Sequence, residues 1–208
     1  VMIDGAEEIS VPDNQEKPDE KNVESSLYAE GSYRFAVFGN TREGKTLFDR
    51  FLMNKAMHTM RANSKFQVFL GADIFQDEIQ RVCTEYLTAK NYSCLKDGIS
   101  TFITLPNVSG TVYNGDASVW TKFQNDVKDA GKNLFIFLDR NFISNRQAEL
   151  LTFERIVNEA AENGKNVYVF GGGFVNNNSI RSRVRYVNTA GIFPSISVDG
   201  TSPSYIKY

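Results

Sequence analysis

The residues best suited to chemistry lie in one short loop. Residues 39–46 read Gly-Asn-Thr-Arg-Glu-Gly-Lys-Thr, which fits the phosphate-loop pattern G-x-x-x-x-G-K-[ST]. In such a loop the backbone N–H groups surround the phosphates, the lysine reaches the terminal phosphate, and the threonine hydroxyl holds Mg²⁺. This interpretation predicts a hydrolase or kinase that uses Mg²⁺ with ATP or GTP. Its phosphate-binding residues would be Gly39, Gly44, Lys45 and Thr46, and the acid that ends the apolar run 134–138, Asp139, would hold the metal.

A strand and a helix must position this loop. Residues 33–38 form a β-rich apolar run, and helix-forming residues follow from Leu47. Further strands are expected at 65–70, 100–105, 134–138, 167–170, 183–187 and 196–198. Helical apolar spacing is expected at 79–86, 119–127 and 150–160. Strands separated by helices predict an α/β fold, a layered sandwich with central mixed sheets flanked by helices.

Composition limits the alternatives. The 208 residues are 41% hydrophobic, and no apolar run approaches the ~20 residues that a membrane span needs. Residues 1–30 carry nine acids and two lysines, so residues 31–208 carry 25 − 9 = 16 acids and 23 − 2 = 21 bases. We therefore expect an acidic linker or extended arm at 1–31, mobile unless a neighbouring domain packs on it, and a folded domain at 32–208. No nucleic-acid partner is expected.

Three arginines alternate near the end of the chain. If Arg181, Arg183 and Arg185 lie on one strand, they share one face. Such a face predicts an anionic ligand, although a solvated surface has the same pattern. The other candidate ligands are few: Cys83 and Cys94 make neither a disulfide framework nor a metal cluster, and His58 is the single histidine.

Taken together and in order, six stretches between residues 33 and 193 resemble the calcineurin-like metallophosphoesterase family. They read FAVFGNTREG, NSKFQVFLGADIF, NYSCLKDGISTFITLPNVSG, WTKFQNDVKDAGKNLFIFLDRNF, GKNVYVFGGGF and RVRYVNTAGIF. The resemblance implies the family's layered fold, and with it a two-metal site at the ends of the strands.

Most of the metal ligands that the resemblance implies are replaced in this chain. The first strand of the family ends in a ligating aspartate, where this chain has Asn40, while Asp73 keeps the acid after the second strand. The Asn-His motif that should follow has no counterpart. The fourth strand should end in histidine, but Asp139 follows Leu138, and the Gly-His-x-His motif is replaced by residues 172–175, with Gly173 and Val175 at the histidine positions. One aspartate cannot build a two-metal site, so no bound metal and no cofactor are expected.

The resemblance explains more of the chain than the phosphate loop does. We therefore expect a catalytically inactive phosphoesterase-like domain that serves binding or scaffolding beside neighbouring domains. The sequence begins at Val1 as if cut from a longer chain, and an acidic arm follows. We therefore expect it to belong to a larger, extracellular or cell-surface protein. The phosphate-loop enzyme is the first alternative, and residual phosphoesterase or phosphodiesterase activity is the second.

Overall fold

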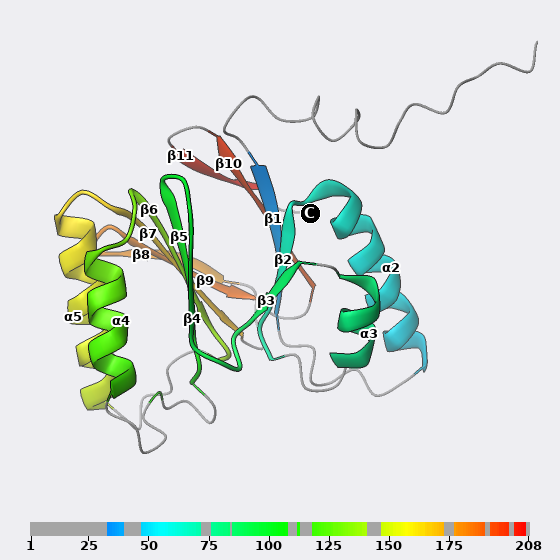
Figure 1. Cartoon of the computed structure of the whole chain (residues 1–208), viewed down its shortest axis with the longest axis horizontal. Helices are drawn as coiled ribbons and strands as arrows, with labels where there is room; N and C mark the ends of the chain where they lie inside the picture. The colour runs from blue at the N-terminus through cyan, green and yellow to red at the C-terminus, as the bar shows by residue number, and fades with distance from the viewer. Residues whose placement is uncertain are drawn as a thin grey trace, which may run out of the picture.

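The fold is a sandwich of two mixed sheets between two helical layers. The computed structural model describes residues 33–39, 47–71, 76–83, 85–107, 112, 118–140, 147–172, 177–189, 192–199 and 202–206. Figure 1 shows one helix pair on each side of the two stacked sheets. The α/β class and the layered arrangement expected from the sequence are confirmed.

The first sheet has five strands in the order β11-β10-β1-β2-β3. Its strands β1, β2 and β3 are parallel, while β10 and β11 add an antiparallel pair. Their bounds are Tyr33–Phe38, Phe66–Phe69, Tyr86–Thr88, Ile192–Asp199 and Ser202–Ile206.

The second sheet has six strands in the order β4-β5-β6-β7-β9-β8. Four central strands, β5, β6, β7 and β9, are parallel, and the edge strands β4 and β8 are antiparallel to their neighbours. Their bounds are Ser93–Asp97 (β4), Ser100–Leu105 (β5), Asn133–Leu138 (β6), Asn166–Gly172 (β7), Asn177–Arg181 (β8) and Val184–Thr189 (β9).

Helices cover the outer face of each sheet. The first sheet packs on α2 (Leu47–Asn63) and α3 (Gln76–Val82). The second packs on α4 (Ser118–Lys128) and α5 (Gln147–Glu162). None of the described helices is long and apolar enough to cross a membrane.

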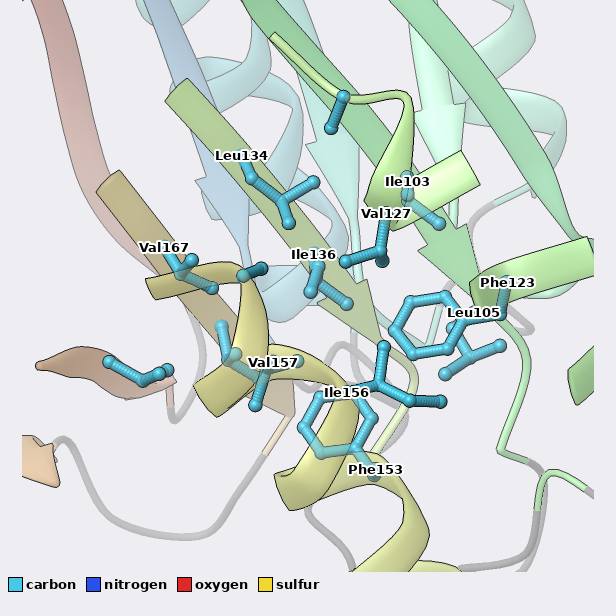
Figure 2. Close-up of a cluster of buried hydrophobic side chains, with 14 of the residues drawn as sticks. Ile103, Leu105, Phe123, Val127, Leu134, Ile136, Phe153, Ile156, Val157 and Val167 are labelled. Carbon is cyan, nitrogen blue, oxygen red and sulfur yellow. The ribbon is translucent and has the colours of Figure 1, made fainter. Parts of the chain in front are cut away.

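The alternation of side chains along β6 shows how the layers are joined. Phe135 and Phe137 face the first sheet, whereas Leu134, Ile136 and Leu138 face α4 and α5. All six residues of β6 are buried, as expected for a central parallel strand with both faces covered. Figure 2 shows the helix-side cluster, in which side chains from α4 and α5 meet those of β5, β6 and β7.

Aromatic rings fill the space between the sheets. The ring centroid of Phe35 on β1 lies 5.4 Å from that of Phe102, 5.1 Å from that of Phe135 and 6.1 Å from that of Phe137. All three pairs are edge-to-face. Edge-to-face pairs at such separations contribute about 0.5–1.5 kcal/mol each beyond area burial. These contacts fix β1 over β5 and β6, and so fix how the ends of the two sheets meet.

One expectation about local structure was wrong. Residues 79–86 were expected to be one helix, but α3 ends at Val82 and Tyr86 begins the parallel strand β3. Two apolar side chains in the first turns of α2 are exposed. Leu47 and Phe51 are 85% and 62% exposed, while Met57 and Met60 from the later turns enter the core.

Candidate functional site at the carboxyl edge of the sheets

The carboxyl ends of the parallel strands form the edge where an α/β sheet ordinarily binds ligands. The ends of β2 and β7 meet there: a Cβ built on Gly172 would lie 3.7 Å from the Cβ of Leu70. At the opposite edge, Lys65 before β2 forms a 2.7 Å ion pair with Asp97 at the β4–β5 turn. The two sheets therefore share the same carboxyl edge and the same amino edge.

Three adjacent positions of the second sheet line this carboxyl edge. Gly172 is registered with Thr189, and Asp139 follows Leu138, the partner of Gly171. Leu138 faces the helices, and Asp139 follows it in the bend after β6. Asp139 is 2% exposed and Thr189 is 1% exposed. The edge therefore holds a carboxylate and a hydroxyl that are both withdrawn from solvent.

Gly172 allows the backbones of β6 and β7 to approach closely at this edge. A Cβ at Gly172 would lie 2.4 Å from the carbonyl oxygen of Asp139. Real side chains do not approach backbone oxygens so closely, so any other residue here would displace the end of β6 or β7. The glycine at this position is required by packing.

Asn107 fixes the backbone that follows Asp139. Its Oδ1 accepts a 2.8 Å hydrogen bond from the backbone N–H of Arg140, and its Nδ2 donates to the carbonyl oxygen of Arg140. Asn107 itself is fully buried. Asn107 had no predicted role, and the signal available was a polar amide directly after Pro106, the residue that follows β5.

Most of the predicted site residues lie outside the described part of the chain. This holds for Asn40, Gly44, Lys45, Thr46, Asp73, Gly173 and Val175. Gly39 directly follows β1, and Asp139 follows β6. Within the described ranges, no three His, Cys, Asp or Glu side chains are grouped as metal ligands. His58 is exposed on α2.

The phosphate-loop interpretation pairs residues from different sheets. The loop 39–46 follows β1 of the first sheet, whereas Asp139 follows β6 of the second. Asp139 is thus placed across the sandwich from β1 and not on a neighbouring strand of the same sheet. The interpretation remains a prediction for residues 40–46.

The prediction that Arg181, Arg183 and Arg185 share one face of a single strand is wrong. Ser182 and Arg183 form the turn between β8 and β9, with positive φ angles of 47° and 70°. Arg181 lies on β8, 3.9 Å from the Glu154 carboxylate and 5.3 Å from the centroid of the Tyr186 ring. Because Arg185 pairs with Ile180 and Arg181 pairs with Val184, the side chains of the two arginines leave opposite faces of the hairpin.

Both cysteines are free thiols. The buried Cys83 donates a 2.8 Å hydrogen bond to the Gln67 side-chain oxygen, and Gln67 donates to the backbone oxygen of Met57. Burial raises the pKa of Cys83 to about 11. A thiol with so high a pKa is almost entirely protonated near neutral pH, which suits a structural residue and not a nucleophile.

The comparisons with known proteins find only distant similarity. No protein-family model and no curated protein sequence matches the chain. A Thermotoga maritima protein solved by NMR is 9% identical with a TM-score of 0.40, covering 85% of this chain and 98% of that one. A conserved uncharacterized protein from Streptococcus pneumoniae, described as a predicted phosphoesterase, is 5% identical with a TM-score of 0.44, covering 86% and 91%. Similarities this weak do not assign a function to the chain.

Proposed function

We propose that residues 32–208 form a phosphoesterase-like domain that does not hydrolyse phosphate esters and acts instead by binding or scaffolding beside neighbouring domains. The proposal includes an extracellular or cell-surface setting, as expected from the acidic arm. The observation that carries it is the burial of Asp139, which is 2% exposed at the carboxyl edge.

A two-metal phosphoesterase needs imidazoles and carboxylates that converge on ions ~3.5–4 Å apart, with positions left open for water and substrate. Asp139 stands where the family resemblance places a histidine, and its side chain is withdrawn from solvent. The described residues beside it are Gly172 on β7 and, after β5, Pro106 and Asn107, while Thr189 lies one strand further away on β9. None of these side chains is an imidazole or a carboxylate, so they do not fit the family's dimetal centre.

The close packing of this edge supports the same proposal. The approach of Gly172 to the carbonyl oxygen of Asp139 joins the ends of β6 and β7, and Leu70 closes on them from the first sheet. An open coordination position needs space at the strand ends, and these three residues fill it with backbone and a leucine side chain.

Metal content and turnover test the proposal together. We expect purified protein to contain no stoichiometric Mn, Fe or Zn by elemental analysis and to show no hydrolysis of an aryl phosphodiester. One or two metal ions per chain, with turnover that copurifies and is lost in Asp139→Asn, would overturn the proposal. Turnover that copurifies and survives chelation would point instead to a rearranged phosphoesterase site.

A further inference from the structure

A pocket lies at the amino edge, where β7 and β9 begin. Asp139 lies at the opposite, carboxyl edge. The pocket has a volume of about 320 Å³. Its lining includes Lys165, Asn166, Tyr168, Ile180, Arg183 and Arg185, and no aspartate or glutamate. Two other pockets between described residues differ, because their linings mix lysines with acids.

The two arginines supply the available positive charge. Lys165 is committed to structure, since its Nζ donates a 3.1 Å hydrogen bond to the backbone oxygen of Lys128 and another to that of Ala130, at the end of α4. Neither Arg183 nor Arg185 forms an ion pair with a carboxylate of the described residues, in contrast to Arg181. Arg185 lies 6.0 Å from the centroid of the Tyr168 ring, which orients the guanidinium and leaves its N–H groups for an acceptor.

The backbone at Arg183 suggests a role other than stability. Two-residue hairpin turns with positive φ favour Asn or Gly, because a side chain in the left-handed region costs roughly 1–2 kcal/mol. Here the turn is Ser182-Arg183, with Arg183 at φ 70°. An arginine held at such a position presents its charge beside Arg185 at the cost of local strain.

Arginine pairs recognise carboxylates and phosphates through paired N–H groups. A large group of carboxylates precedes Tyr33, the first residue of β1. Residues 1–30 carry nine acids and two lysines, a net charge of 2 − 9 = −7. Figure 1 shows that β1 begins at the same end of the sandwich as the β4–β5 turn, which marks the amino edge.

The arm is long enough to reach the pocket. Sheets pack ~10 Å apart and strands lie ~4.8 Å apart. Since β1 stacks on β5 and β6, while the pocket lies at β7 and β9, the separation from Tyr33 is on the order of 15–20 Å. Five or six extended residues at ~3.3 Å each span that distance, and 32 residues precede Tyr33.

We infer that the pocket of Arg183 and Arg185 binds a carboxylate-rich peptide segment, and that the acidic residues 1–30 of this same chain are its occupant. Because the arm is part of the same chain as the pocket, weak contacts are enough for the arm to occupy it. A short flexible connection gives an effective concentration in the millimolar range, so a millimolar site is about half filled. The pocket is thus regulated from within the chain, and a partner with a denser acidic segment displaces the arm.

Competition in the 208-residue chain tests this inference. The probe is a fluorescein-labelled oligoglutamate peptide, followed by anisotropy at about 0.01 M salt, where the Debye length is ~30 Å. One variant neutralises the arm with Glu16→Gln, Asp19→Asn, Glu20→Gln and Glu24→Gln. A second removes the pocket charges with Arg183→Ala and Arg185→Ala.

Neutralising the arm should tighten probe binding by up to about twofold, because an arm that half fills the pocket doubles the apparent Kd of the probe. The pocket variant should lose binding in either background, and about 1 M salt should abolish it. Two matched controls should bind the probe as the unmodified protein does. They are Arg81→Ala with Arg155→Ala, on exposed helix positions, and Asp77→Asn with Glu85→Gln, which are also exposed.

Several results would overturn the inference. Equal binding by the unmodified and arm-neutralised proteins would show that the arm does not occupy the pocket, and absence of binding by both would show that the pocket takes no carboxylate peptide. Displacement by inorganic phosphate, without binding of the peptide, would identify a phosphate site instead. Each result is independent of metal content and turnover, so the proposed function stands or falls separately.

Discussion

The candidate sites at the two edges of the parallel strands differ in how far their polar side chains are exposed. At the carboxyl edge Asp139 and Thr189 are buried, and Gly172 brings the strand ends into contact. At the amino edge Arg183 is exposed and Arg185 is half-buried, and both line an open pocket.

This difference shows that the geometry of a sheet offers a site but does not by itself provide one. Parallel strands direct ligands to their carboxyl ends because loops and backbone dipoles converge there. Among the described residues of this chain, the strand ends around Gly172 are closed by packing at that edge, whereas two accessible arginines line a pocket at the other edge. Breaking the closed edge should therefore cost stability, while altering the open edge should change binding.

The largest effect is expected from Gly172→Ala. The added Cβ would meet the carbonyl oxygen of Asp139 at 2.4 Å, and forcing atoms into packed space costs about 1–3 kcal/mol. Since the obstacle is backbone, we expect a loss near the upper end of that range, measured by urea unfolding.

Gly98→Ala is the comparison for Gly172→Ala. Nothing lies within 4 Å of its added Cβ, and only the positive φ of 56° opposes it. We expect a loss of about 1 kcal/mol there. A Gly172→Ala protein as stable as the unmodified one would mean that the carboxyl edge is looser than the sandwich indicates.

Asn107→Ala should destabilise by about 2 kcal/mol. The substitution leaves both the N–H and the carbonyl oxygen of Arg140 without their side-chain partner, and each unsatisfied buried group costs ~1–3 kcal/mol, less where water reaches it. Chemical denaturation measures the loss. Asn125→Ala, at an exposed position of α4, should change stability by less than about 0.5 kcal/mol, and equal losses in the two variants would contradict this role.

The sequence predicted the layers better than the edges. The apolar runs at β6 and β7 and the helical spacing of α4 and α5 reflect burial, and the order of apolar residues in a sequence records burial directly. Tyr86 was misplaced because its spacing from Val82 continues the helical pattern after α3 has ended. Pairing with β2 decides its conformation, and pairing is a property of the sheet.

The arginine hairpin escaped prediction for a different reason. Two-residue hairpin turns with positive φ are signalled in sequence by Gly, Asn or Asp, and Ser182-Arg183 supplies none of these. Without the turn, alternation placed three arginines on one face. The roles of Asn107 and Gly172 depend on contacts with Arg140 and Asp139 across strands, which no local pattern records.

A smaller effect, of opposite sign, is expected at the amino edge. Arg183→Gly removes the side chain from a left-handed backbone position, and should stabilise the protein by about 0.5–1 kcal/mol. The same variant should bind the oligoglutamate probe more weakly. Unfolding and anisotropy on one preparation measure both. A loss of stability together with unchanged binding would show that Arg183 serves the fold and not the pocket.

The smallest expected effect is at residues 39–46, where the two interpretations of the carboxyl edge diverge. A working phosphate loop would gather the backbone N–H groups of Gly44, Lys45 and Thr46 around a β-phosphate. Ligand at 100 times its Kd would then raise the free energy of unfolding by about 2.7 kcal/mol, which shifts the Tm by roughly 5–10 °C for a chain of this size. With Asp139 buried in the opposite sheet, we expect millimolar ATP or GTP with Mg²⁺ to shift the Tm of neither the unmodified protein nor Lys45→Ala. A rise of several degrees that disappears in Lys45→Ala would establish a nucleotide site, and would show that the carboxyl edge opens where the described strand ends are closed.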